Sequence, residues 1–167
     1  MPAKTKRTKQ TKQTKQAKQA KRAKPRKRVR SPRHVVRRAP ESLRLRAMSA
    51  SLTVSDLERS SAWYRDVLGF IVGERWEESG RLRGVQMKAG HCDVLLNQDD
   101  FQKGRDRAKG VGMRLWLSTA QDLDAVAARA QAHGGVLDEP PTHTAWGAYV
   151  FTITDPDGFR LTLVREE

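Results

Sequence analysis

Cysteines and long apolar runs are scarce in this 167-residue chain, and each shortage excludes a class of protein. Cys92 is the only cysteine, which excludes an internal disulfide and a zinc site built on thiolates. No stretch approaches the roughly 18 consecutive apolar residues that a membrane-spanning helix needs. A secretory signal would require an apolar stretch behind its charges, and residues 1–47 contain none. We therefore expect a cytoplasmic protein without a membrane segment.

Residues 1–47 contain no aromatic side chain and almost no acidic one. They hold 19 of the 33 Lys and Arg but only Glu41 among the 19 Asp and Glu, so the net charge of +14 comes from this segment. With almost no branched apolar side chains, the segment cannot bury enough surface to offset the entropy of ordering, and we expect a disordered tail.

Two interpretations of this tail remain open. Lysines recur at every third position from Lys6 to Lys24, which would allow electrostatic attachment to nucleic acid. Because no aromatic side chains are available for base stacking, that binding would be non-specific. Alternatively, Met48 is the true start, since it directly precedes the first periodic segment, and the upstream residues are a misassigned extension.

Residues 48–167 are slightly acidic and long enough for one domain with a substantial core. Apolar alternation predicts strands, and apolar residues at helical spacing predict two helices, over 56–68 and 120–135. Ser55 and Glu58 fit a capping box at the start of the first helix. The predicted strands lie at 49–55, 70–76, 82–89 and 92–97, then at 112–118, 135–139, 146–154 and 159–165.

The two halves of this domain repeat each other. Asp56-Leu57 matches Asp122-Leu123, and Gly69 matches Gly135, all with an offset of 66 residues. The order strand, helix and three strands therefore occurs twice, in modules of about 48–100 and 111–167.

The runs LTVSDLERSSAWYRDVLGF (52–70) and WGAYVFTITDPDG (146–158) resemble the vicinal oxygen chelate superfamily, which includes glyoxalase I, extradiol dioxygenases and bleomycin resistance proteins. The resemblance covers residues 49–166 and none of the tail. It implies an α+β fold in which two βαβββ modules form a curled mixed sheet around a cleft. It also implies a homodimer as the common assembly.

The enzymes of that superfamily hold a divalent metal through His, Gln or Glu side chains in the cleft. The corresponding positions here fall on Ser49, on or beside Met113, on Thr162 and near Leu95. Side chains of these types cannot assemble a site for a hard cation. We therefore expect no metal cofactor, and the spacing of the remaining residues indicates no catalytic set.

Strand parity predicts what would line the cleft instead. If Ser49 points inward, Ser51 and Thr53 do too, and Leu52 and Val54 pack under the helices. The predicted ligand contacts are Leu95, Met113 and Thr162, the aromatic residues Tyr149 and Phe151, Trp146 at the rim, and Arg160 and His143. Leu115 is also expected to face inward, whereas Trp116 and Cys92 are expected in the core, and Asp99 in a solvated turn.

An aromatic cleft with few polar groups is typical of a binding site for a flat organic molecule. The preferred hypothesis is a domain that binds a small organic ligand in this cleft without metal. The first alternative is a lyase or dioxygenase of the same superfamily with a displaced metal site. The second is a protein associated with nucleic acid through its tail.

Overall fold

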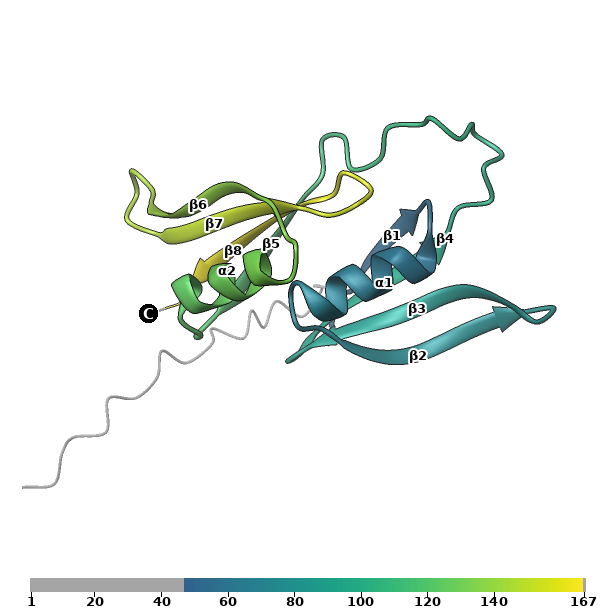
Figure 1. The fold of residues 1–167 in the computed structure, drawn as a ribbon, viewed down its shortest axis with the longest axis horizontal. Coiled ribbons are helices and arrows are strands. Elements are labelled where there is room, and N and C mark those ends of the chain that lie inside the picture. The colour runs from purple at the N-terminus through teal and green to yellow at the C-terminus, as the bar shows by residue number, and fades with distance from the viewer. Residues whose placement is uncertain (1–46, 167) are drawn as a thin grey trace, which may run out of the picture. The chain divides into compact units, whose positions relative to one another are not determined.

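The computed structural model describes residues 47–166. The predicted tail therefore lies outside the described residues, except for Ala47, and its predicted disorder, nucleic-acid binding and alternative start remain predictions. Within the described range two modules follow each other, each with the order strand, helix and three strands (Figure 1). The α+β fold and the paired modules predicted from the sequence are confirmed.

Each module contains one mixed four-stranded sheet, with the order β1-β4-β3-β2 in sheet 1 and β5-β8-β7-β6 in sheet 2. In both sheets the first and last strands of the module pair in parallel, and the other neighbours are antiparallel. Within the described residues no strand pairing joins the two sheets. The bounds are β1 Ala50–Val54, α1 Leu57–Asp66, β2 Ile71–Glu78, β3 Arg81–Ala89, β4 Cys92–Gln98, β5 Arg114–Thr119, α2 Leu123–Ala132, β6 Leu137–His143, β7 Tyr149–Thr154 and β8 Arg160–Arg165.

Both helices begin at an aspartate of the internal repeat. The Asp56 side chain accepts a hydrogen bond from the Arg59 backbone N–H, and Asp122 accepts one from Asp124 in the same way. The predicted capping box was therefore placed one residue too early. The backbone N–H of Ser55 instead donates to Asp157, 102 residues away in the sequence.

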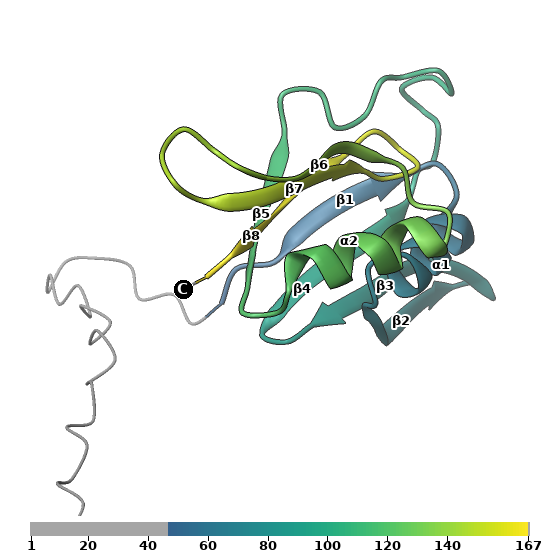
Figure 2. The same ribbon diagram turned by 60° about the vertical axis from the view of Figure 1, so that its left-hand side comes forward.

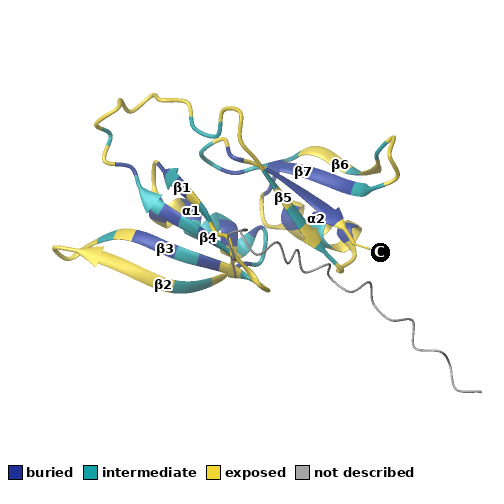
Figure 3. Ribbon diagram, turned by 180° about the vertical axis from the view of Figure 1, so that it is seen from behind, coloured by how far each residue is buried: buried dark blue, intermediate teal, exposed yellow. Residues whose placement is uncertain are grey.

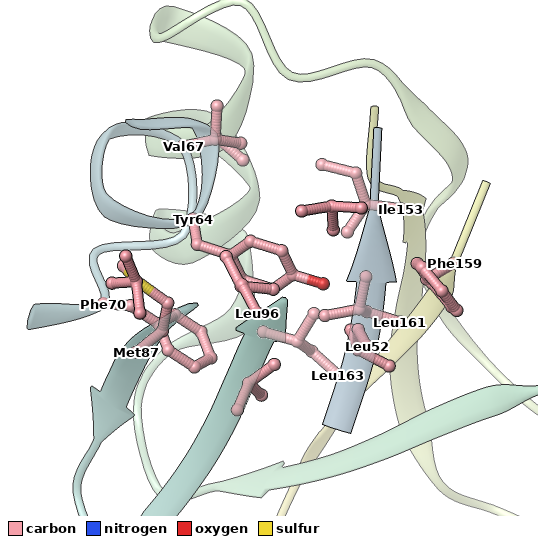
Figure 4. Packing of buried hydrophobic residues seen from close by; sticks show 14 of the residues in the cluster. Leu52, Tyr64, Val67, Phe70, Met87, Leu96, Ile153, Phe159, Leu161 and Leu163 are labelled. Atoms are coloured by element: carbon pink, nitrogen blue, oxygen red, sulfur yellow. The ribbon is translucent and has the colours of Figure 1, made fainter. Parts of the chain in front are cut away.

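One hydrophobic core serves both modules. Leu52 and Val54 are buried, as their alternation predicted, and they belong to the same cluster as Ile153 and Leu161 of module 2. Tyr64 of α1 lies in the middle of the cluster (Figure 4) and is fully buried. Because the apolar faces of both sheets are used in this shared core, neither module can bury its core alone.

The helices α1 and α2 lie near each other in Figure 1 and in Figure 2, and a repeat glycine lies just after the end of each. A Cβ on Gly135 would lie 2.6 Å from Cγ1 of Val67, and one on Gly69 would lie 2.4 Å from the Arg129 guanidinium. No real side chain tolerates such distances without displacing its neighbour. The matched glycines therefore permit the close approach of each helix end to the other module.

The turn after β7 also joins the modules. The Tyr64 hydroxyl donates to Asp155 at 3.1 Å, and Asp157 accepts from the Ser60 hydroxyl at 2.9 Å. Burial raises the pKa of the Asp155 carboxyl, while the backbone N–H groups of Phe159 and Asp157 oppose that rise. The D-P-D-G motif thus positions two carboxylates against the first helix.

The segment between the modules, residues 99–113, is fixed by a buried lysine. Lys109 Nζ lies 3.1 Å from Asp99 and 3.8 Å from Asp157, and all three side chains are about 5% exposed or less. Arg107 makes a second ion pair with Asp99 at 3.1 Å. The prediction that Asp99 is solvated was wrong, because this segment folds back over it. Gly110 permits the approach, since a Cβ there would lie 2.3 Å from the Gly158 carbonyl oxygen.

One exposed edge strand carries prolines that disfavour pairing with a further strand. The edge strands β2 and β6 are largely exposed, whereas β7 and β8 are buried over most of their length (Figure 3). Pro140 and Pro141 lie in β6 and cannot donate hydrogen bonds to an added strand. Neither α1 nor α2 is long and apolar enough to cross a bilayer.

Side-chain orientation in β5 differs from the prediction. Leu115 pairs with Leu161 and packs against the core, while Trp116 pairs with Thr162 on the other face and is 50% exposed. The turn before α2 is one residue longer than the turn before α1, so the offset of 66 that aligns the helices becomes 65 for the strands. A shift of one residue moves every side chain of a strand to the opposite face.

Candidate functional site

Each sheet has an open face, which we define as the face opposite its helix. On the open face of sheet 1, Trp76 of β2 lies over Gly84 of β3 and remains 39% exposed. A Cβ on Gly84 would lie 2.8 Å from Trp76 Cε3, so the indole occupies space that any other residue would fill. The absence of a side chain at Gly84 therefore provides the seat for an exposed aromatic ring.

Polar groups continue this surface across the sheet. Asn97 of β4 pairs with Gly84 in the register, and its amide donates to the Ser51 hydroxyl of β1 at 2.9 Å. Leu95 pairs with Ser51 on the same face and is half-buried. We call these five residues, Trp76, Gly84, Leu95, Asn97 and Ser51, the Trp76 platform. It combines an aromatic ring, an apolar side chain, an amide and a hydroxyl on rigid strands.

A small hollow borders the platform at β1, and we call it the edge hollow. Its volume is about 280 Å³. Its floor is formed by Ser51 and Thr53, and the segment between the modules forms its wall. The lining residues are Ser51, Thr53, Arg107, Ala108, Lys109, Gly110, Val111 and Phe159.

The open face of sheet 2 also carries a tryptophan. Trp116 stands beside Thr162, whose buried hydroxyl lies 3.2 Å from that of Thr152. Arg160 shares this parity, is exposed, and lies 3.8 Å from Asp138. Met113 precedes β5 and is 39% exposed. Each sheet thus presents one exposed tryptophan on its open face.

Three of the predicted contacts gather elsewhere, around the turn between β6 and β7. Tyr149 donates from its hydroxyl to Asp124 of α2 at 2.8 Å, and this hydrogen bond raises the pKa of the tyrosine. The His143 ring lies 4.7 Å from the Tyr149 ring, and Trp146 is exposed in the turn. His143 and Tyr149, but not Trp146, border a hollow of about 770 Å³, the hairpin hollow, lined by Ala120, Asp124, His143, Gly147, Ala148, Tyr149, Arg165 and Glu166.

Two further residues lie in unexpected surroundings. Phe151 is fully buried in the core, because Thr152 pairs with Thr162 on the open face and Phe151 must point the other way. It therefore cannot contact a ligand on the open face. Cys92, predicted to be a core thiol, is exposed at the start of β4.

The positions that the sequence resemblance matched to metal ligands carry side chains that do not fit a divalent cation. Ser49 is exposed just before β1, and the buried Thr162 hydroxyl is hydrogen-bonded with that of Thr152. Neither these side chains nor Met113 and Leu95 offer the imidazole or carboxylate ligands such a cation requires. In residues 47–166 no group of three or more His, Cys, Asp or Glu side chains is placed to hold a metal ion.

Comparison with known proteins assigns the fold to a family. Residues 46–163 match the Glyoxalase/Bleomycin resistance protein/Dioxygenase superfamily. The chain belongs to this superfamily. A search of curated proteins found no match.

Solved structures of the superfamily fold resemble this chain at low sequence identity. TnmS3, an antibiotic binding protein from Streptomyces sp. CB03234, is 25% identical, with a TM-score of 0.57 over 74% of this chain and 100% of its own. TioX from Micromonospora sp. ML1 is 21% identical, with a TM-score of 0.60 over 72% and 98%. A superfamily member from Sphaerobacter thermophilus DSM 20745 is 26% identical, with a TM-score of 0.57 over 72% and 98%.

Sequence reasoning missed the two tryptophans on the open faces. Trp76 lies in a strand of mostly polar residues, where no apolar alternation draws attention to it. A lone tryptophan in such a strand, with a glycine in the partner strand, was the available signal. Trp116 was missed because the parity of its strand was set from Met113, which turned Leu115 towards the cleft and Trp116 towards the core.

Proposed function

We propose that this superfamily domain binds a planar organic molecule on the Trp76 platform. The observation that carries the proposal is the exposed indole of Trp76 on the edge strand β2, which lies over Gly84 of the neighbouring strand β3. An exposed aromatic ring stacks on flat ligands, and the nearby Asn97 and Ser51 can orient them through hydrogen bonds. The superfamily relationship and the antibiotic-binding neighbour TnmS3 support binding of a small molecule.

A second copy of the chain completes the site in this proposal. Sites for drug-sized ligands commonly enclose about 300–1,000 Å³. The edge hollow reaches only about 280 Å³, and the platform beside it is open. Trp116 on the open face of sheet 2 is half exposed and provides a second aromatic wall. A homodimer that brings Trp116 of one copy over Trp76 of the other would place the ligand between two rings.

Fluorescence titration of the full chain with N-phenyl-1-naphthylamine, a neutral probe with a flat naphthalene ring, tests this function. Trp76→Ala should weaken binding about tenfold, because the stacking partner is lost. Trp116→Ala should also weaken it if the second wall is present. Trp146→Ala is the matched control, since Trp146 is exposed in the β6–β7 turn and should change the dissociation constant by less than about twofold.

The outcomes separate the parts of the proposal. Equal affinity of the wild-type protein and Trp76→Ala would contradict binding on the platform. Loss of affinity in Trp76→Ala with none in Trp116→Ala would retain the platform but contradict the second copy as its other wall. A loss confined to Trp146→Ala would contradict binding on the platform and move the site to the β6–β7 turn.

A further inference from the structure

The edge hollow differs in charge from the domain around it. Two of its eight lining residues, Arg107 and Lys109, are cations, and no Asp or Glu from residues 47–166 lines it. The sequence from Met48 onward is slightly acidic. The charged side chains that line the hollow are therefore both cations, supplied by the segment between the modules.

Hydrogen-bond donors dominate the hollow. The Ser51 hydroxyl accepts from Asn97, which leaves its own O–H to donate. Within residues 47–166, neither Ser51 nor Thr53 donates a side-chain hydrogen bond. Arg107 donates one N–H to Asp99, and the other N–H groups of its guanidinium remain as donors. A ligand group that enters here meets several donors.

Asp99 and Asp157 form an ion cluster with Lys109 and Arg107, and their carboxylates are buried more deeply than the Arg107 side chain. Asp99 and Asp157 are about 5% exposed or less, whereas the Arg107 side chain is 36% exposed. Lys109 is occupied by both carboxylates and by the Ser55 hydroxyl at 2.6 Å. Arg107 is therefore the cation available to a ligand, and Lys109 holds the segment in place.

From these observations we infer that the edge hollow holds an anionic, acceptor-rich group of the ligand, such as a carboxylate, sulfonate or phosphate, through Arg107, Ser51 and Thr53. This inference rests on the proposed function, because the platform holds the planar body of the same ligand. Ser51 belongs to both the platform and the hollow. Gly84, under the Trp76 ring, is two strands from Ser51, or roughly 10 Å. The ligand class is thus a planar organic acid of about that length.

Two fluorescent probes with the same ring system test the inference. N-phenyl-1-naphthylamine is neutral, and 8-anilinonaphthalene-1-sulfonate adds one sulfonate. Arg107→Gln in the full chain should weaken binding of the sulfonate about tenfold, because a charged hydrogen bond is lost. It should change binding of the neutral probe by less than about twofold. The Gln amide can still donate to Asp99, and thermal unfolding verifies that the variant folds.

Arg105→Gln is the matched control. Arg105 lies on the same segment, over the Phe101 ring, and does not line the hollow. Arg105→Gln removes the same charge as Arg107→Gln, and the charge of residues 1–47 is the same in all variants. Thr53→Val keeps the shape of the side chain and removes the hydroxyl. It should weaken binding of the sulfonate probe about threefold and leave binding of the neutral probe unchanged.

The possible results have distinct meanings. Equal sulfonate binding by the wild-type protein and Arg107→Gln would overturn the anion site and leave the platform intact. Equal weakening by Arg105→Gln and Arg107→Gln would also overturn it, because only general attraction would remain. Failure of both probes to bind the wild-type protein would contradict the proposed function itself, and the inference with it.

Discussion

Lys109→Met is expected to lower the free energy of unfolding by about 3 kcal/mol. The lysine is almost fully buried between Asp99 and Asp157, and Met keeps the length of its stem without the charge. Its removal leaves the buried Asp157 without this cation and Asp99 with Arg107 alone, and an uncompensated buried charge is costly. Urea denaturation monitored by circular dichroism measures the loss.

The control for this variant is Lys103→Met, on the same segment. Lys103 is exposed and should change stability by less than about 0.5 kcal/mol. A free energy of unfolding for Lys109→Met within about 1 kcal/mol of the wild-type value would contradict a role of this ion cluster in holding the modules together.

Acid should reduce the difference between Lys109→Met and the wild-type protein. The backbone N–H of Phe101, followed by Lys109, lowers the pKa of Asp99 to about 2. An aspartate in an unfolded chain titrates near 3.9, so the stability from this group is present above that pH and disappears as the pH falls towards 2. The cost of the substitution should therefore be constant near neutral pH and decrease below about pH 4.

Tyr64→Ala should have a larger effect, about 4 kcal/mol of stability. The Tyr64 ring makes edge contacts with Trp63 and Phe70, with centroids 5.1 and 5.5 Å apart. Its hydroxyl also donates to Asp155 of module 2. The truncation creates a cavity in the shared core and removes a hydrogen bond between the modules.

Tyr64→Phe separates these two contributions. It keeps the ring and should cost only about 1 kcal/mol, the usual contribution of one hydrogen bond. Ser61→Ala, one turn earlier on the same helix, should stay within about 0.5 kcal/mol of the wild-type protein. A loss below about 1.5 kcal/mol for Tyr64→Ala would contradict a single core shared by both modules.

The fold was predictable because local patterns and long-range packing agree in most elements. Leu52 and Val54 alternate with polar residues, so their burial followed from the sequence alone. The matched pairs Asp56 and Asp122, and Gly69 and Gly135, marked the start and end of both helices. Their second role, in the contact between the modules, required the packed structure.

The site was less predictable because it depends on strand register. One additional residue before α2 reversed the orientation of Leu115 and Trp116. The pairing of Thr152 with Thr162 placed Phe151 in the core, which the resemblance alone did not reveal. The Trp76 platform depends on a glycine in the neighbouring strand and on Asn97 two strands away. Neither relation is visible in any local stretch of sequence.

The contribution of the segment between the modules was also hidden. Arg107 and Lys109 lie in a polar stretch without periodicity, typical of an exposed connection. Their approach to the sheet depends on Gly110 and, through Lys109, on the Asp157 carboxylate of the D-P-D-G turn, which lies about fifty residues later in the sequence.

The central claim is that a planar ligand stacks on Trp76. The four tryptophans give four indole N–H signals in a two-dimensional NMR spectrum, and single Trp→Phe variants assign them. On titration with N-phenyl-1-naphthylamine, the Trp76 signal should shift in proportion to occupancy, while the Trp63 and Trp146 signals remain in place. Saturation of binding with an unshifted Trp76 signal, or with a shift only at Trp146, would contradict the claim.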